Sequence, residues 1–275
     1  MSRREKIFCI LGVVLIAAVG LLVTFRFLPL ERDVTGQTGE RYQGVMKNGR
    51  YEGRGLLTYA PGDHRLSYEG GFADNLRHGR GTMIWRDGTK YEGAWQNGRM
   101  YGTGLMTYAP DSSTLSYEGE FVNNRYHGQG TMIWKNGQKY EGQWQNGRMH
   151  GRGVIAYALD DDNSRVSYEG GFDNNLRHGR GTMIWNDGQK YEGQWRDDRM
   201  HGPGLMTYLP DSGVLSYDGE FVNGRRNGQG VMTWKNGKRQ EGQWKDGRLY
   251  NGMEYDAVGR VISRTVNGKK NLNAE

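Results

Sequence analysis

The chain has 275 residues, of which 45 are glycine and only 5 are proline, and 12% are aromatic. Glycine does not recur at every third position, which excludes collagen, and the aromatic content is too high for a disordered chain. The formal charge of +6 comes from 37 basic and 31 acidic residues that are interleaved along the sequence. Nucleic-acid-binding proteins gather their basic residues on one face or arm, so we expect no nucleic-acid partner.

The first 28 residues contain an apolar run over residues 7–25 without a charged residue, preceded by three basic residues. A helix of this length, at ~1.5 Å per residue, crosses a hydrocarbon core of ~30 Å. A cleaved signal peptide is the alternative, but the apolar run continues beyond Gly20, past the small residues where cleavage would occur. We therefore predict an uncleaved signal anchor with one transmembrane helix in residues 1–28, followed by a linker over 29–41.

The basic residues before the apolar run predict the orientation of this anchor. The positive-inside tendency places the N-terminus in the cytoplasm and the rest of this single-pass membrane protein outside it, in the periplasm if the cell is bacterial. Cys9, the only cysteine, lies within the leader, so no disulfide is expected in the remainder of the chain.

The tripeptide Tyr-x-Gly recurs eight times after the leader, and a ninth copy begins at Gln240 in place of tyrosine. The eight tyrosines are Tyr42, Tyr68, Tyr91, Tyr117, Tyr140, Tyr168, Tyr191 and Tyr217. Their spacing alternates between 23 residues and 26 or 28 residues, so two copies make one larger unit. Repetition of this kind predicts a solenoid of stacked supersecondary units.

Each copy has the same pattern of apolar and turn residues. An aromatic residue stands four positions after the tyrosine, as Phe72 does, except that the first copy has a methionine there. Side chains alternate between the faces of a strand, so the tyrosine, the glycine after it and this aromatic residue share one face. Turn sequences such as Asn97-Gly98 favour the left-handed backbone that closes tight hairpins. Each copy is therefore predicted to be an antiparallel hairpin with one apolar face, which stacking of the copies buries.

Segments such as residues 140–153, Tyr-Glu-Gly-Gln-Trp-Gln-Asn-Gly-Arg-Met-His-Gly-Arg-Gly, resemble the MORN (membrane occupation and recognition nexus) repeat. The resemblance covers residues 42–253 as eight to nine repeats. It implies an all-β fold, an elongated and twisted antiparallel sheet solenoid of stacked β-hairpins, with roles in protein scaffolding, homodimerisation and contact with membranes or lipids. Residues 254–275 remain as a C-terminal cap or tail, in which we expect a last strand over 258–266.

Five histidines stand ten residues after their tyrosines: His78, His127, His150, His178 and His201. Adjacent copies would hold them ~10 Å apart, because a hairpin adds two strands of ~4.8 Å. Ligands of one metal ion must approach it to ~2 Å. We therefore predict no metal site, and expect each histidine to hydrogen-bond its own hairpin.

The glutamates that follow the tyrosines form a second ladder. Equivalent positions in a repeat have equivalent surroundings, so no division into a catalytic acid and a base is expected. We predict cross-strand ion pairs with the basic residues that precede several copies, such as Lys90 and Lys139. No nucleophile, phosphate-binding or metalloprotease motif is present, so we expect no catalytic residue, no cofactor and no enzyme.

The aromatic ladder has two interpretations. Exposed rings stack on glycans or on cationic groups, whereas buried rings form the core of a thin sheet. The alternation of apolar and polar positions favours the core.

Every second copy carries a longer loop, and these loops fall at the same position of the repeat. Binding loops of repeat proteins commonly share one edge. The candidate partner-binding residues are therefore Asp63, Asp111, Asp160, Asp161, Asp162 and Asp211. We predict a membrane-anchored, non-enzymatic scaffold that binds a protein partner; the alternative is binding of a lipid headgroup or a cell-envelope glycan by the repeats.

Overall fold

The computed structural model of the chain describes residues 31–158 and 165–272. The chain divides into two units, with the boundary between Arg125 and Tyr126. The predicted transmembrane helix lies outside the described residues. Within the described ranges, no helix has the length and apolar character needed to cross a membrane.

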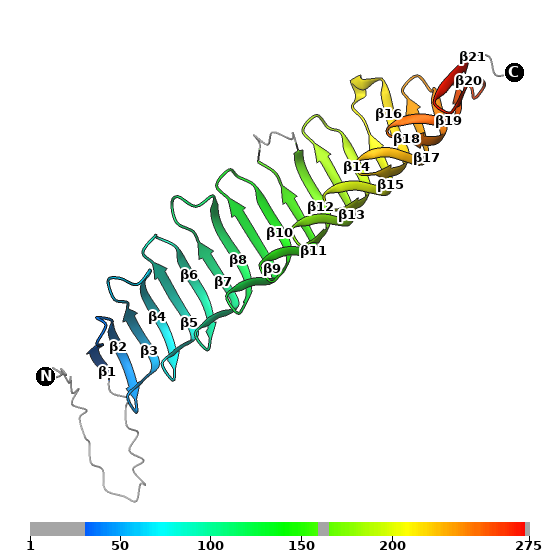
Figure 1. The fold of residues 1–275 in the computed structure, drawn as a ribbon. Helices are drawn as coiled ribbons and strands as arrows, with labels where there is room; N and C mark the ends of the chain where they lie inside the picture. Colours follow the sequence, from blue (N-terminus) through cyan, green and yellow to red (C-terminus); the bar gives the residue numbers. More distant parts are fainter. Residues whose placement is uncertain (1–30, 159–164, 273–275) are drawn as a thin grey trace, which may run out of the picture. The chain divides into compact units, whose positions relative to one another are not determined.

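The first unit is an antiparallel meander in which each strand pairs with the next one along the chain (Figure 1). Its strands are β1 (Glu31–Thr35), β2 (Arg41–Lys47), β3 (Arg50–Thr58), β4 (Arg65–Ala73), β5 (Leu76–Trp85), β6 (Lys90–Gln96), β7 (Arg99–Thr107) and β8 (Thr114–Val122).

The second unit repeats this arrangement, again with every strand paired to its successor. A 3₁₀ turn, η1 (Pro210–Ser212), precedes β16. The strands are β9 (Arg125–Trp134), β10 (Lys139–Gln145), β11 (Arg148–Ala156), β12 (Arg165–Asp173), β13 (Leu176–Trp185), β14 (Lys190–Arg196), β15 (Arg199–Thr207), β16 (Val214–Val222), β17 (Arg225–Trp234), β18 (Arg239–Lys245), β19 (Arg248–Tyr255), β20 (Val261–Val266) and β21 (Lys269–Leu272).

The predicted all-β fold of stacked antiparallel hairpins is confirmed in each unit, and the two ends need correction. Part of the predicted linker over 29–41 is strand β1, which pairs with β2 and thereby satisfies the backbone groups along that strand's edge. An ion pair of 2.5 Å between Arg41 and Asp33 links the two strands. At the other end, the predicted last strand begins at Val261 rather than at residue 258, because a turn closed by Gly259 N–H to Asp256 precedes it. Strand β21 then adds one more pairing.

The hairpin turns adopt the predicted left-handed backbone. Asn97 and Gly98 have φ values of 49° and 78°, and the equivalent turn residues Asn146 and Gly147 have 52° and 83°. The turn glycine also reaches the preceding hairpin, because the Gly98 N–H donates to the carbonyl of Arg77 at 2.9 Å. Each turn therefore closes its own hairpin and bonds the hairpin before it.

The tyrosine ring of a repeat lies over two glycines that face one another on adjacent strands. Tyr68 lies over the paired residues Gly70 and Gly81, and a Cβ atom added at Gly70 would come 2.5 Å from the tyrosine oxygen. The hydroxyl of Tyr68 donates to the carbonyl of Gly71 at 3.0 Å. The other seven tyrosines also donate to the carbonyl three residues ahead. This contact explains why glycine recurs at both positions.

The aromatic residue four positions after each tyrosine completes the core of the sheet. The ring of Phe72 meets the ring of Tyr68 edge to face at 5.1 Å, and Trp95 meets Tyr68 and Tyr91 at 5.3 Å each. The Trp95 indole N–H donates to the carbonyl of Gly81 at 3.2 Å. All eight ladder tyrosines are 0% exposed, so the interpretation of the aromatic ladder as a core is confirmed.

Replacement of Gly81 by alanine should destabilise the sheet. The added Cβ would lie 2.5 Å from Cζ of Tyr68 and would force the ring off the glycine pair. Overpacking of this kind costs about 1–3 kcal/mol, measurable as a lower free energy of unfolding in urea. Gly62→Ala is the matched control, because nothing lies within 4 Å of a Cβ at Gly62. Equal stability of the two variants would contradict the steric account.

The buried tyrosines should also set the alkaline limit of the fold. Burial raises the pKa of Tyr91 and of Tyr217 to about 12, whereas an unfolded tyrosine ionises near pH ~10. The stabilisation from keeping these phenols neutral is complete below pH ~10 and is lost as the pH rises through their folded-state pKa values. We expect tyrosinate absorbance and loss of the strand circular dichroism to appear together above pH ~10. Ladder tyrosines that titrate near pH ~10 while the sheet stays intact would contradict this.

Candidate functional site

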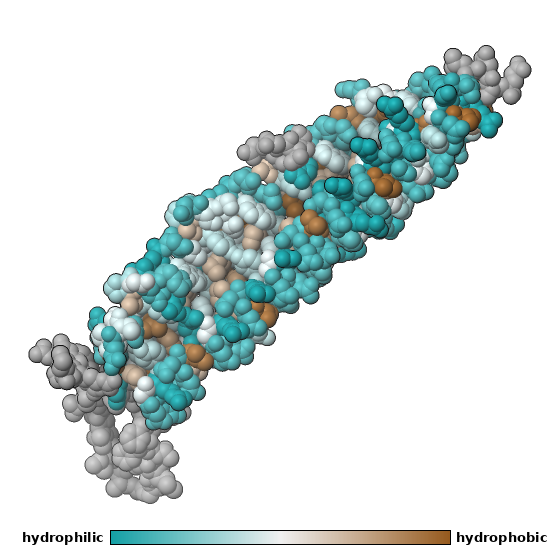
Figure 2. Space-filling view, in the orientation of Figure 1, coloured by the Kyte–Doolittle hydropathy of each residue, from teal (hydrophilic) through white to brown (hydrophobic). Residues whose placement is uncertain are grey.

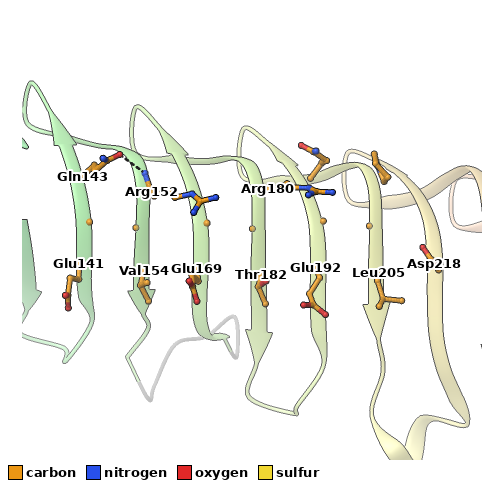
Figure 3. Close-up of a pocket in the computed structure, with 18 of the residues that line it drawn as sticks. Glu141, Gln143, Arg152, Val154, Glu169, Arg180, Thr182, Glu192, Leu205 and Asp218 are labelled. Carbon is orange, nitrogen blue, oxygen red and sulfur yellow. Dashed lines mark hydrogen bonds between the residues drawn. The ribbon is translucent and has the colours of Figure 1, made fainter. Parts of the chain in front are cut away.

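Each unit carries a groove on the sheet face that points away from the buried tyrosines. The groove of the second unit has a volume of about 1030 Å³ and is lined by residues of eight consecutive strands, β9 to β16. The groove of the first unit has a volume of about 640 Å³ and is lined by strands β3 to β8. Both grooves therefore run across the strands rather than along them, as Figure 3 shows for the second unit.

One wall of the groove alternates acidic side chains with uncharged ones. In the second unit, the strand registers align Glu141 with Val154, Val154 with Glu169, and Glu169 with Thr182, and the row continues to β16. We call the acidic members the carboxylate row: Glu69, Glu92 and Glu118 in the first unit, and Glu141, Glu169, Glu192 and Asp218 in the second. All are exposed.

The opposite wall carries arginines two residues further along the strands. We call them the arginine row: Arg54 and Arg80 in the first unit, and Arg152 and Arg180 in the second. Figure 3 shows Arg152 and Arg180 at one level of the sheet and Glu141, Glu169 and Glu192 at another. A glycine follows each of these arginines along its strand and lies between the two levels. The floor of the groove is therefore main chain, because the tyrosine rings cover the other side of the glycines.

Every second carboxylate is neutralised by a lysine on its own strand. The pairs Lys90–Glu92 and Lys139–Glu141 each have an N–O distance of 2.8 Å, and Lys190–Glu192 has 3.0 Å. The predicted pairing with these lysines is thus confirmed, but the predicted cross-strand geometry is wrong. Residues two apart on one strand point to the same face, so a lysine reaches its glutamate without crossing to a neighbour.

The remaining carboxylates of the row are not neutralised by a lysine. Among the described residues, Glu69, Glu118, Glu169 and Asp218 have no hydrogen-bond or ion-pair partner for their side chains. The same holds for the guanidinium groups of the arginine row within residues 31–158 and 165–272. Such exposed and unpaired charges on two facing walls can bind groups of opposite charge without first breaking an internal contact.

A sequence profile of the MORN repeat matches residues 42–64, 68–90, 91–113, 117–139, 140–158, 168–190, 191–208 and 217–239. These segments cover more than half of the chain. The chain belongs to the MORN repeat family. No curated protein matches it.

Several solved structures resemble the fold at low similarity. The TCP domain of Drosophila melanogaster SAS-4 (dCPAP), in complex with a proline-rich motif of Ana2 (dSTIL), is 14% identical and has a TM-score of 0.27, covering 66% of this chain and 92% of that one. The wild-type TCP10 domain of Danio rerio CPAP is 14% identical, with a TM-score of 0.27 and coverage of 86% and 99%. Its complex with a peptide of Danio rerio STIL is 12% identical, with a TM-score of 0.26 and coverage of 86% and 94%. With TM-scores this low, nothing about this chain is inferred from them.

Of the predicted loop residues, Asp63, Asp111 and Asp211 line neither groove. Asp63 is engaged within its own loop: its carboxylate accepts from the Arg65 backbone N–H at 2.8 Å and from the Arg65 guanidinium at 2.6 Å. These hydrogen bonds lower the pKa of Asp63. Asp111 and Asp211 are exposed at loop tips, and Asp211 lies in the first turn of η1. Asp160, Asp161 and Asp162 fall outside the described residues.

Two members of the histidine ladder, His150 and His178, differ from the prediction. The Nδ1 atom of His150 lies 3.3 Å from the carboxylate of Asp173, which belongs to the following copy, so this contact links neighbouring repeats rather than closing one hairpin. His178 lies 3.8 Å from Asp197 in the same way. In the part of the chain that the structure describes, no group of three or more His, Cys, Asp or Glu residues is placed to hold a metal ion.

The charged groove was not predicted, although the sequence contains a pattern that indicates it. The decapeptide Leu76–Trp85 recurs without a change as Leu176–Trp185, which reveals a longer period of four MORN repeats. Arginine stands twelve positions after the tyrosine only in certain copies of this period, whereas Thr103, Gln129 and Pro203 occupy the same position elsewhere. A search for differences between copies, rather than for likeness, would have found the arginine row.

The contacts of Asp63 predict unequal roles for the loop aspartates. Asp63→Ala removes the hydrogen bonds to Arg65 and should lower the free energy of unfolding by about 1 kcal/mol, since the pair is partly exposed. The pKa of Asp63 is lowered in the folded state, so this contribution is present above the unfolded pKa of ~3.9 and is lost as the pH falls below it. Asp111→Ala is the control and should change stability by less than ~0.5 kcal/mol. Equal effects of the two substitutions on urea unfolding would contradict the assignment.

Proposed function

We propose that this MORN-repeat chain is a non-enzymatic scaffold, anchored in a membrane through residues 7–25, that binds a protein partner in its grooves. The observation that carries the proposal is the pair of oppositely charged walls, with Glu169 and Arg180 exposed and unpaired across a floor of main chain. A groove that extends over many strands suits an elongated ligand, such as a segment of polypeptide, better than a compact substrate.

The groove is a better candidate than the loop edge that the sequence analysis favoured. Asp63 is occupied by Arg65, and Arg86 donates to the main-chain oxygen of Asp63 at 2.7 Å, so this loop is held by its own contacts. The carboxylate and arginine rows have no comparable engagement at their unpaired positions. A ligand that binds in the groove would therefore break fewer internal contacts than one that binds at the loop of Asp63.

A non-enzymatic role is supported by the repetition itself. Glu92, Glu141 and Glu192 are all exposed and all paired with a lysine on the same strand, which gives them equivalent surroundings. Catalytic acids and bases need surroundings that push their pKa values apart. Membrane attachment, with the N-terminus in the cytoplasm and the repeats outside it, rests on the charge pattern of residues 1–28.

Binding of a lipid headgroup or a glycan is the alternative function. The tyrosine rings of the ladder, which would have to stack on a sugar, are 0% exposed. Their burial does not favour glycan binding. The exposed apolar residues are separated by polar ones, and Figure 2 shows a largely hydrophilic face with small, isolated apolar spots. Flotation of the chain without residues 7–25 on neutral and anionic vesicles separates the two functions, since a protein scaffold requires no vesicle binding.

Blocking the groove should abolish partner capture. Thr182 lies on the wall between Glu169 and Glu192, so Thr182→Arg fills the groove and adds a positive charge to that wall. If the added side chain weakens the free energy of binding by about 1.4–3 kcal/mol, the amount of captured partner should fall roughly tenfold or more. The measurement is the amount of partner crosslinked to the tagged full chain in its own membranes and identified by mass spectrometry.

Asp211→Ala is the control for this experiment, because Asp211 was predicted on the loop edge and does not line the groove. Circular dichroism of the purified variants establishes that both remain folded. Capture that survives Thr182→Arg and disappears with Asp211→Ala would place the partner on the loops and reject the groove.

A further inference from the structure

The groove walls present the same chemical groups at a regular distance. Carboxylates stand on every second strand of the second unit, on β10, β12, β14 and β16, and the two arginines stand on β11 and β13. Adjacent strands lie ~4.8 Å apart, so the carboxylates and the arginines each recur every ~9.6 Å along the groove. The carboxylates without a lysine partner, Glu169 and Asp218, recur every ~19.2 Å, which is twice that distance. A ligand that uses several of these charges at once must carry its own charged groups with nearly the same repeat.

Among regular polypeptide conformations, polyproline II has the closest repeat. It has three residues per turn and a rise of ~3.1 Å, so every third residue points in the same direction after ~9.3 Å. A β-strand returns to the same side after two residues, or ~6.8 Å. An α-helix has a pitch of ~5.4 Å and a diameter of ~10–12 Å. Only polyproline II stays within ~0.3 Å of the wall spacing at each repeat.

The two walls also match the three ridges of a polyproline II segment. Successive residues point about 120° apart, because three residues complete a turn. One ridge can therefore face the carboxylate row while the next faces the arginine row. The arginines are displaced by one strand from the carboxylates, or ~4.8 Å, and successive residues of the ligand are displaced by ~3.1 Å. Arginine and lysine side chains are long enough to absorb this difference of ~1.7 Å.

The same set of unpaired charges occurs once in each unit. Arg54, Glu69 and Arg80 lie on β3, β4 and β5, and in the second unit Arg152, Glu169 and Arg180 lie on β11, β12 and β13. In the first unit, Arg54 pairs with Gly71, and a Cβ at that glycine would collide with the carbonyl of His78. No side chain therefore stands between the two arginines of the set. Gly171 occupies the same place beside Arg152.

We propose that each groove binds a partner segment in the polyproline II conformation, with a basic residue at every third position and an acidic residue next to it. The basic side chains face the carboxylate row, and the acidic side chains lie between the two arginines. Each unit holds one such site, so one chain engages two segments. The inference rests on the proposed function, because it specifies the partner that the groove takes.

The test uses a fluorescent synthetic peptide of about four Pro-Lys-Glu repeats, which spans roughly 37 Å and covers the ~34 Å from β9 to β16. Its binding to the full chain in detergent is measured by fluorescence anisotropy. The comparison peptide has the same composition, with the prolines, lysines and glutamates gathered in blocks. We expect the repeating peptide to bind and the block peptide to bind at least about fivefold more weakly, because a block places at most two like charges on one ridge, whereas the repeating peptide places four.

The variant Arg180→Gln should weaken binding of the repeating peptide by roughly two- to fivefold, and Arg80→Gln together with Arg180→Gln should weaken it further, since each removes one exposed ion pair. Arg199→Gln is the matched control, because Arg199 is exposed on the second unit and does not line its groove. Equal binding of both peptides, no binding of either, or an equal effect of Arg199→Gln overturns the inference. If the captured partner still depends on Thr182 in that case, the groove remains the binding site and only the polyproline II ligand is rejected.

Discussion

A tyrosine ring lying across two facing glycines is the contact on which the rest of this structure depends. The ring needs two bare backbone positions side by side, and Gly70 with Gly81 provides them in one hairpin as Gly142 with Gly153 does in another. A slip of one residue would put a side chain under the ring and would move the aromatic stripe to the opposite face. The contact therefore sets the register of each hairpin as well as its core, and the turn glycines bond successive hairpins to one another.

The same contact explains why the other face is available for binding. The buried tyrosine, phenylalanine and tryptophan rings of the repeats lie on the tyrosine side, so stability does not require the groove side to bury anything. The groove walls can then vary from copy to copy without loss of the fold. The positions one and twelve residues after the tyrosine hold a glutamate and an arginine in some copies, and a glutamine or a proline replaces the arginine in others. Repeat proteins combine constant and variable positions in this way, and the variable ones carry specificity.

Much of the fold was predictable because its determinants are local and periodic. The alternation around Tyr68 and Phe72 indicates one apolar strand face, and Asn97-Gly98 indicates a tight turn; both predictions are confirmed. Strand β1 was not predicted because its charged sequence has no apolar face and is held by pairing with β2 instead. The Lys139–Glu141 pair was assigned to two strands since sequence spacing alone does not say which of several nearby groups is closest. The groove was missed because it is defined by side chains on neighbouring strands, and in the sequence only the differences between copies at the position of Arg80 indicate it.

In the proposed function, the groove face and not the loop edge meets the partner. Site-specific photocrosslinking tests this directly: a benzophenone amino acid replaces Thr182 on the groove wall in one full chain and Asp111 at a loop tip in another. The crosslinker is activated in intact cells, and adducts are resolved by electrophoresis. We predict a discrete protein adduct from the groove position and none from the loop position. An adduct from the loop position alone would contradict the account.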